Sequence, residues 1–303
     1  MAGPHAGLVA GLVGALLAGL VAGCAAPASG QSPAPDRALI VRAPNGAREE
    51  IPFTIGKPEG AGPFPAVVIM HDCSGLGPRS SGAPGRWARE LGSRGYVTVI
   101  PDSFTTRGHP DGVCTDASPT RGEVAPSRRV RDAYAALAHA RALPYVDGRR
   151  AFLMGGSHGG STTLASMAAP ESTVEPLARE KGTGFAAAVA LYPSCGATLG
   201  DRAGTYRPVA PILILIGEKD DWTPAEACVK LAASTRASEY PVAITVYPDA
   251  HHSFDSDRPV RFVAARVNRN APGGRGATTG GNATAWADSI RRVAEFFGER
   301  LKP

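Results

Sequence analysis

The chain has 303 residues, of which 43% are hydrophobic and 19% are charged, and its formal net charge is +5. These values are ordinary for a folded globular protein, and about 280 residues, enough for one large α/β domain or two small ones, would remain after loss of an N-terminal leader. Arginine outnumbers lysine, but no dense basic run is present. The charge therefore indicates a solvated basic surface, and we expect no nucleic acid among the partners.

The N-terminus has the pattern of a targeting segment. Residues 7–23 form a short, apolar, glycine-rich stretch that ends in small residues, which predicts a signal peptide over 1–23 rather than a membrane span. Val21-Ala22-Gly23-Cys24 resembles the lipobox of bacterial lipoproteins, although the segment before the apolar stretch has His5 and no lysine or arginine. We expect lipid on Cys24, and the alternative is a plain secretory peptide cut next to Cys24.

The predicted mature chain consists of a flexible tether over 24–44 and a single domain over 45–303, because 25–36 has the composition of a linker. The expected location is extracytoplasmic, in the periplasm or at the cell surface, with membrane attachment through the lipid on Cys24.

Short apolar runs alternate with helix-like stretches along the rest of the chain. The predicted strands are a strand or hairpin near 48–57, then 66–70, 96–100, 151–154, 186–192, 211–216 and 242–247. The predicted helices are 84–94, 126–142, 158–169, 224–237 and 283–301. Several runs are continuously apolar, which is typical of parallel strands that helices cover on both faces. We expect an open, doubly wound, mostly parallel α/β sheet, with ligands at the carboxyl ends of the strands.

A glycine-rich motif follows the 151–154 run. Gly155-Gly156-Ser157-His158-Gly159-Gly160 contains G-x-S-x-G at a strand-to-helix junction, where a sharp turn would lift the serine hydroxyl above the sheet. The start of the next helix would help to stabilise an oxyanion. The alternative is a glycine-rich connector in which Ser157 only caps the helix.

Two aspartates follow the 211–216 run, in Gly217-Glu218-Lys219-Asp220-Asp221-Trp222-Thr223-Pro224. Thr223 to Glu226 has the pattern of a capping box with proline at the first helical position, so a helix is expected to begin there. Both aspartates are thereby confined to the loop that leaves the strand.

Two histidines, His251 and His252, follow the 242–247 run. A serine needs a base that is held by an acid in order to become a strong nucleophile, and either histidine is placed to serve. The chain order Ser, Asp, His is the order expected of such a triad on this fold. Surface or loop-packing histidines are the alternative.

Taken together, these segments resemble the α/β-hydrolase superfamily and, more narrowly, the dienelactone-hydrolase-like family, over roughly residues 45–302. The resemblance also rests on His71-Asp72-Cys73-Ser74-Gly75 and Pro101-Asp102-Ser103-Phe104, which follow the first two core strands. It implies Asp220 as the acid and His252 as the base. It also implies an oxyanion hole formed by the amides of His158 and Cys73. Cys73 beside His71 is a competing nucleophile.

The enzymes that give the family its name use cysteine at the elbow, whereas this chain has Ser157. The resemblance therefore implies general serine-esterase chemistry through an acyl-enzyme, with a small-molecule ester as substrate and no metal or organic cofactor. Two alternatives remain: a serine peptidase of the prolyl-oligopeptidase type, and a non-catalytic surface lipoprotein that uses the fold as a scaffold. The sequence leaves the oligomeric state open.

Four cysteines remain after Cys24, and four permit three pairings. We prefer Cys73–Cys114 with Cys195–Cys228, because this pairing joins loops at neighbouring strand ends of the expected fold, and the first bridge would hold the Cys73 loop rigid. Unpaired buried thiols are the alternative. Metal ligation is disfavoured, because no C-x-x-C pair is present.

Three side chains and three loops have no settled role. Arg107 is a candidate for contact with an anionic substrate, with a structural ion pair as the preferred interpretation. Trp222 and Phe254 either line the pocket or pack in the core. The segments 103–125, 170–184 and 255–281 are expected to shape the pocket, and 268–283 is predicted to be a mobile loop.

Overall fold

The computed structural model describes residues 1, 3, 38–169, 184–196 and 206–302. The predicted leader, Cys24, the tether as far as residue 37 and most of the 170–184 segment lie outside these residues. The chain divides into two units, Met1–Asp36 and Arg37–Pro303, and the second unit carries the fold described below.

The fold is built on an eight-stranded sheet in the order β1-β2-β4-β3-β5-β6-β7-β8. The strands are β1 (Ala38–Arg42), β2 (Arg48–Gly56), β3 (Phe64–Met70), β4 (Val97–Pro101), β5 (Val146–Gly156), β6 (Ala188–Leu191), β7 (Ile212–Gly217) and β8 (Ala243–Tyr247). The β1–β2 and β2–β4 pairs are antiparallel, and every pair from β4 to β8 is parallel. The carboxyl ends of these six parallel strands therefore meet at one edge of the sheet, where reactive loops can gather.

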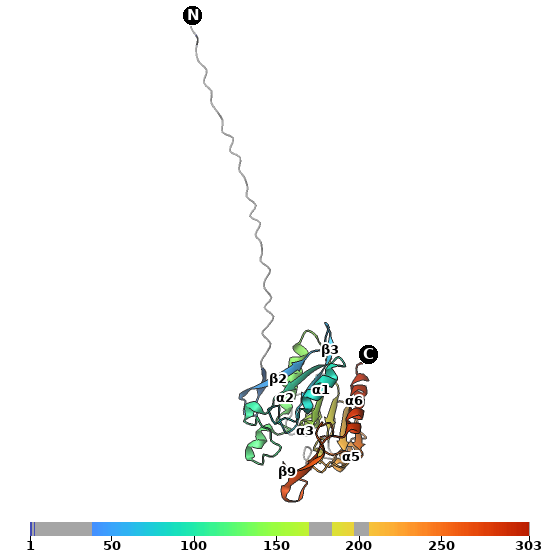
Figure 1. The fold of residues 1–303 in the computed structure, drawn as a ribbon. Helices are drawn as coiled ribbons and strands as arrows, with labels where there is room; N and C mark the ends of the chain where they lie inside the picture. The colour runs from blue at the N-terminus through green and yellow to red at the C-terminus, as the bar shows by residue number, and fades with distance from the viewer. Residues whose placement is uncertain (2, 4–37, 170–183, 197–205, 303) are drawn as a thin grey trace. The chain divides into compact units, whose positions relative to one another are not determined.

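Helices cover both faces of the sheet (Figure 1). The helices are α1 (Ala83–Gly92), α2 (Val130–Ala142), α3 (His158–Met167), α5 (Ala225–Ser234) and α6 (Ala283–Gly298). Helices α2 and α3 contact each other and β5, whereas α1 and α6 meet through the edge-on rings of Trp87 and Trp286, with centroids 4.7 Å apart. Because helices lie on both faces, the central strands must be apolar throughout, and all six residues of β7 are buried. The predicted α/β-hydrolase fold class is confirmed.

A two-stranded antiparallel hairpin, formed by β9 (Arg261–Val267) and β10 (Arg275–Thr279), follows β8. It projects from the sheet in orange at the bottom of Figure 1. Residues 268–283 were predicted to be one mobile loop, and this prediction is wrong. The segment contains β10 and a short 3₁₀ turn at Pro272–Gly274, and Asn268 fixes that turn by donating hydrogen bonds from Nδ2 to the carbonyl oxygens of Asp221 (3.0 Å) and Gly276 (2.7 Å).

One further boundary differs from the expectation. Residues 38–42, assigned to the tether, form β1, whose apolar Leu39 and Val41 are buried against the sheet.

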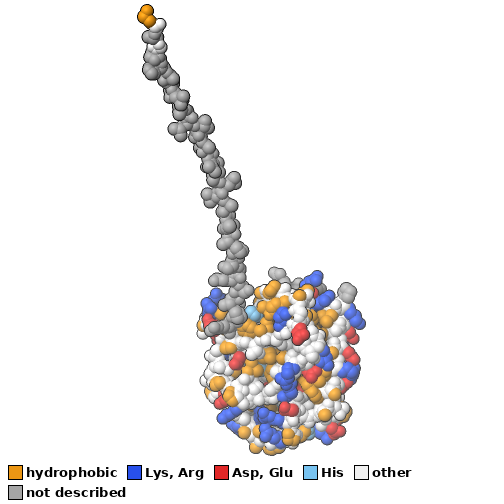
Figure 2. All heavy atoms as spheres, turned by 45° about the horizontal axis from the view of Figure 1, so that its top comes forward, with side chains coloured by type: hydrophobic (Ala, Val, Ile, Leu, Met, Phe, Trp, Pro, Cys, Tyr) orange, Lys and Arg blue, Asp and Glu red, His pale blue; other side chains and the backbone are white. Residues whose placement is uncertain are grey.

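Lysine and arginine side chains form several separate groups among acidic and apolar side chains on the face shown in Figure 2. Within the described ranges, no helix combines the length and apolar character needed to cross a bilayer.

Candidate active site

Ser157 lies on a strained turn between β5 and α3. Its backbone has φ 52° and ψ −114°, a conformation that L-residues rarely adopt, and its side chain makes no helix-capping hydrogen bond. The glycines around it allow very close packing: a Cβ on Gly155 would lie 2.4 Å from the carbonyl oxygen of Gly159, and one on Gly156 would lie 2.7 Å from the hydroxyl of Tyr192. The turn therefore presents the serine as a nucleophile elbow would, and the simple capping interpretation does not describe it.

His252, in the loop after β8, approaches this serine directly. Its Nε2 lies 2.8 Å from Oγ of Ser157, and both residues are buried, with exposed fractions of 1% and 8%. The carbonyl oxygen of His252 accepts a hydrogen bond of 3.0 Å from the amide of Gly280, just beyond β10. The hairpin thus helps to hold the backbone of the histidine.

Asp220 holds the other side of the imidazole. Its Oδ2 lies 2.8 Å from Nδ1 of His252, while its Oδ1 accepts the amides of Trp222 (3.0 Å) and Thr223 (2.8 Å). With Nδ1 protonated toward the carboxylate, the lone pair on Nε2 faces the serine hydroxyl, which is the arrangement that general-base catalysis needs.

The neighbouring candidates point elsewhere. Asp221 accepts the amide and the hydroxyl of Thr278, both at 2.8 Å, and so fastens the loop to β10. His251 contacts the carbonyl oxygen of Lys219 through Nδ1 at 3.0 Å. The structure therefore brings Ser157, His252 and Asp220 together and leaves Asp221 and His251 outside this chain of hydrogen bonds.

Thr223 is a member of the site that the sequence interpretation missed. Its Oγ1 lies 2.9 Å from Oδ2 of Asp220, 3.0 Å from Nδ1 of His252 and 3.1 Å from the carbonyl oxygen of Tyr192. The predicted capping box is wrong, because α5 begins after Pro224 with no side-chain cap. A threonine three residues after the acid, in the loop that leads from β7 to α5, was the available signal.

The candidate oxyanion-hole residues come from two segments that touch. The amide of His158 is the first of α3, where the initial N–H groups have no partner within the helix. A Cβ on Gly159 would lie 2.0 Å from the carbonyl oxygen of Met70 and 2.7 Å from that of His71, so the start of α3 packs directly on the end of β3. Cys73 follows on that same loop and is buried.

The loop after β3 is tied down on several sides. The carboxylate of Asp72 accepts the amide of Ser74 at 2.7 Å, the hydroxyl of Ser74 at 2.5 Å and the hydroxyl of Ser81. Cys73 forms a disulfide with Cys114. Because Cys73 is oxidised, it has no thiolate, and its competing interpretation as a nucleophile is wrong.

The second disulfide joins Cys195, after β6, to Cys228 in α5. Both preferred pairings are therefore present. In the described part of the chain, Asp72, Cys73 and Cys114 are the side chains whose ligand atoms cluster closely enough for a metal ion, but two of these three are consumed by the disulfide.

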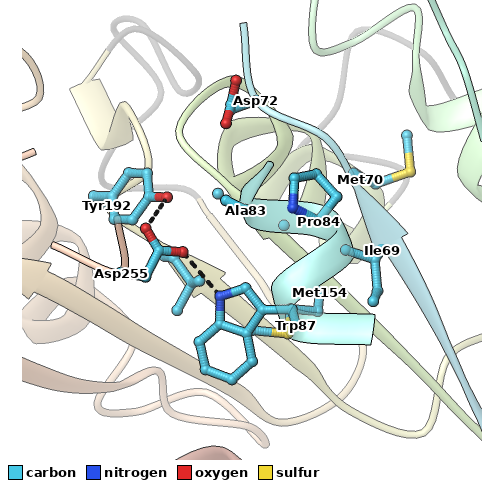
Figure 3. Close-up of a pocket in the computed structure, with 12 residues that line it drawn as sticks. Ile69, Met70, Asp72, Ala83, Pro84, Trp87, Met154, Tyr192 and Asp255 are labelled. Carbon is cyan, nitrogen blue, oxygen red and sulfur yellow. Dashed lines mark hydrogen bonds between the residues drawn. The ribbon is translucent and has the colours of Figure 1, made fainter. Parts of the chain in front are cut away.

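A small buried pocket lies against the elbow, between α1 and the ends of β3, β5 and β6 (Figure 3). In it, the carboxylate of Asp255 accepts hydrogen bonds from the Tyr192 hydroxyl (2.8 Å) and the Trp87 indole (2.9 Å). Burial raises the pKa of Asp255. The ring of Tyr192 also packs edge-on against His252, with centroids 4.7 Å apart. These contacts therefore help to fix the loop that carries His252.

Two further histidines near the site are held neutral. Nε2 of His71 accepts the amide of Ser103 at 3.2 Å, which leaves Nδ1 to donate to the carbonyl oxygen of Asp72 at 2.8 Å. Nδ1 of His158 faces Nη1 of Arg129 at 2.8 Å and must accept from it. Burial, reinforced by the charge of Arg129, lowers the pKa of both imidazoles well below the ordinary value.

The remaining candidates are resolved by their contacts. Arg107 forms ion pairs with Glu49 (2.6 Å) and Asp132 (2.7 Å), so the structural interpretation holds for this arginine. Phe254 is fully buried in the core. Trp222 is half-buried, its ring centroid lies 4.8 Å from that of His252, and its indole donates to the carbonyl oxygen of Val267 at 2.8 Å. Of the two aromatic residues, Trp222 is the one placed beside the candidate site.

Comparison with known proteins identifies the family of the chain. A family model described as the dienelactone hydrolase family matches residues 51–301. A protein of Escherichia coli K12, provisionally named a carboxymethylenebutenolidase, is 27% identical over 219 residues, which cover 67% of this chain and 72% of the relative.

Two solved structures share the fold. A protein of Klebsiella pneumoniae subsp. pneumoniae MGH 78578, described provisionally as a dienelactone hydrolase, superposes with a TM-score of 0.59 at 21% identity, covering 82% of this chain and 93% of that one. The apo form of Thermogutta terrifontis esterase 2 superposes with a TM-score of 0.57 at 19% identity, covering 88% of this chain and 96% of that one. The chain therefore belongs to the dienelactone hydrolase family, and it has the α/β-hydrolase fold.

Proposed function

We propose that the protein is an exported serine hydrolase that cleaves carboxylic esters, with Ser157 as nucleophile, His252 as general base and Asp220 as the acid that orients the histidine. The observation that carries this proposal is the pair of 2.8 Å contacts in series, from Oγ of Ser157 to Nε2 of His252 and from its Nδ1 to Oδ2 of Asp220. All three residues are buried, so the contacts act in a low-dielectric site.

The reaction proceeds in two steps. Oγ of Ser157 attacks the ester carbonyl carbon while Nε2 of His252 takes its proton, and the amides of His158 and Cys73 bind the oxyanion. When the tetrahedral intermediate collapses, the leaving alcohol takes the proton from His252. Water then attacks the acyl-enzyme with His252 again as base, which releases the acid and returns the proton to Ser157. Asp220 stabilises the imidazolium in both steps.

Substitution of the nucleophile tests the assignment. Ser157→Ala should lower kcat on p-nitrophenyl acetate by about 10³- to 10⁶-fold and leave the thermal unfolding midpoint essentially unchanged. The surface variant Ser118→Ala is a matched control that should keep full activity. Near-full turnover by Ser157→Ala would refute the proposal.

Two experiments separate this function from its alternatives. A fluorophosphonate probe should label Ser157 in the wild type, and an unlabelled folded protein would favour a non-catalytic scaffold. A matched ester and anilide should show a strong preference for the ester, whereas comparable rates would favour a serine peptidase.

A cation beside the site favours an ester that carries a negative charge. The guanidinium of Arg266, on β9, lies over the ring of Trp222 at 4.9 Å, and its Nη1 is 4.0 Å from Sγ of Cys73. Its buried Nε has no hydrogen-bond partner, and none of the carboxylates in the described ranges reaches ion-pair distance. The provisional name of the Escherichia coli relative denotes action on a carboxymethylene butenolide.

The preference is measured with a pair of esters that differ in charge, such as p-nitrophenyl butyrate and mono-p-nitrophenyl succinate. Arg266→Gln should reduce kcat/KM for the anionic ester by about 10- to 100-fold more than for the neutral one, the range expected for loss of a charge-assisted hydrogen bond. Arg266→Lys should retain part of the preference. Equal losses for both esters would remove Arg266 from substrate recognition.

Export is supported by the two disulfides, which persist in oxidising compartments. The proposed leader over 1–23 and the proposed acylation of Cys24 are tested by the intact mass of the mature protein. A lipidated N-terminal Cys24 is expected, and an unprocessed chain would contradict the proposal.

A further inference from the structure

Arg129 is a buried cation that forms no ion pair with any carboxylate of the described residues. The side chain is completely buried at the N-cap of α2, and among the carboxylates that the structure describes none lies within ion-pair distance of it. Burial lowers the pKa of Arg129 to about 9, which shows how incompletely its surroundings compensate the charge. The adjacent Arg128 differs, because it forms ion pairs with Glu49 and Glu123. A buried charge of this kind lowers the stability of the fold, so its contacts are expected to serve a function.

The contacts of Arg129 join two segments of the site. Nη2 donates to the carbonyl oxygen of His71 at 2.9 Å, and Nη1 donates to Nδ1 of His158 at 2.8 Å. The guanidinium also lies over the ring of Phe104, 4.9 Å from its centroid. Phe104 in turn packs edge-on against the rings of both His71 and His158, at 4.4 and 5.5 Å.

These are the two segments that carry the proposed oxyanion-hole amides. His158 supplies one amide itself, and the His71 carbonyl belongs to the peptide that leads through Asp72 to Cys73, which supplies the other. The two segments touch where Gly159 leaves no room for a side chain against the His71 carbonyl oxygen. Arg129 therefore links the two segments that carry the proposed oxyanion-hole amides.

We infer that Arg129 is a positioning residue for the oxyanion hole: its guanidinium fixes the spacing of the Cys73 and His158 amides and places a positive charge close to them. This inference rests on the proposed function. Only arginine combines two donors in a rigid planar fork with a charge that persists at neutral pH. A fixed charge near a developing oxyanion lowers the energy of the transition state more than that of the neutral ester.

The test compares Arg129→Met and Arg129→Lys with the wild type on p-nitrophenyl acetate. Arg129→Met should lower kcat by about 10²- to 10³-fold, the effect typical of a lost oxyanion-hole donor, with KM within about threefold. Arg129→Lys, which keeps the charge but loses the planar pair of donors, should have a kcat between that of Arg129→Met and that of the wild type. Inhibition by a trifluoromethyl ketone, whose adduct places an oxyanion in the hole, should weaken by the same factor as kcat/KM.

The matched control is Arg128→Met, which removes the adjacent, ion-paired arginine and should leave kcat and inhibitor affinity within about twofold of the wild type. A fall in kcat of Arg129→Met without weaker inhibitor binding, or no fall at all, would overturn the inference. A wild type that neither hydrolyses the ester nor reacts with a fluorophosphonate would instead contradict the proposed function.

A second pair of variants decides the question if Arg129→Met does not fold. His158→Leu keeps the backbone amide but removes the acceptor for Arg129, whereas His158→Asn retains an acceptor oxygen near the position of Nδ1. His158→Leu should weaken the trifluoromethyl ketone by about tenfold, the effect of one lost charge-assisted hydrogen bond, and His158→Asn should restore most of the affinity. Equal inhibitor affinities of the two variants would overturn the inference.

Discussion

Nε2 of His252 lies 2.8 Å from Oγ of Ser157, although 95 positions of the chain separate the two residues. The sheet order explains the contact: β5, which ends one residue before the serine, and β8, which precedes the histidine, are separated only by β6 and β7, and all four strands are parallel. The loop after β7 brings Asp220 to the far side of the imidazole. A change that moves Asp220 or His252 should therefore alter the reactivity of Ser157.

Thr223 provides the first prediction. Thr223→Val removes the hydroxyl that lies within 3.0 Å of both Asp220 and His252, so the acid and the imidazole should lose part of their alignment. We expect kcat to fall by about fivefold, since a typical hydrogen bond contributes about 1 kcal/mol, with little change in KM. Steady-state kinetics checks this. Thr223→Ser, which keeps the hydroxyl, should retain most of the activity, and equal losses in the two variants would mean that the methyl group is what matters.

The two adjacent aspartates provide the second prediction. Asp220→Asn should lower kcat by about 10⁴-fold, because the amide no longer selects the imidazole tautomer that presents a lone pair to Ser157. Asp221→Asn should leave kcat within about threefold of the wild type, because that carboxylate binds Thr278 on β10. The reverse ranking of the two kcat values would contradict the assignment of the acid.

The sequence was informative about the strand ends and less so about the choice within each loop. Apolar runs and glycines located the serine, the acid loop and the histidine loop. Choosing Asp220 over Asp221 required the family resemblance, because both residues leave the same strand and only the fold of the hairpin turns Asp221 toward Thr278. Thr223 was missed because its local pattern also fits a helix cap, and its true partner, His252, lies 29 positions away.

The two disulfides provide a matched pair for the third prediction. Replacing Cys73 and Cys114 by serine opens a loop of 41 residues and should cost about 3–4 kcal/mol of unfolding free energy. It should also lower kcat, because Cys73 carries a proposed oxyanion-hole amide. Replacing Cys195 and Cys228 opens a loop of 33 residues and should cost a similar amount, with a much smaller effect on kcat. Chemical denaturation and kinetics of both double variants test this, and equal losses of kcat would contradict it.

The buried imidazoles of His71 and His158 provide the fourth prediction. Burial lowers the pKa of each in the folded state, so below pH of about 6.5 the unfolded chain binds protons that the folded chain does not. Stability should therefore be full above that pH and be lost as the pH falls, by up to about 1.4 kcal/mol per pH unit for each histidine. Urea denaturation between pH 7.5 and 5 measures the slope.

His158→Asn is the control for that slope. The asparagine cannot take up a proton in this range and keeps an acceptor for Arg129, so the pH dependence should decrease by about 1.4 kcal/mol per unit. An unchanged slope would show that other groups cause the acid sensitivity.

Other parts of the fold were hidden from the sequence for physical reasons. β1 is short and follows a stretch of linker-like composition, and it is stable only because Leu39 and Val41 pack against the sheet. β10, with the sequence Arg-Gly-Ala-Thr-Thr, has a weak strand signal and depends on its pairing with β9. Arg107 could not be distinguished from a substrate contact because one of its partners, Glu49, is 58 positions distant.

Hydrogen bonds join the β9–β10 hairpin to the loop that carries Asp220 and to the loop that carries His252. Thr278 binds Asp221 beside the acid, Gly280 binds the backbone of His252, and Val267 receives the Trp222 indole. A hairpin joined in this way cannot swing open without disturbing the residues that do the chemistry. The hairpin is therefore a fixed part of the site and does not act as a lid. Ester hydrolysis should start without a lag, and its rate should not rise abruptly when the ester concentration exceeds its solubility and droplets form.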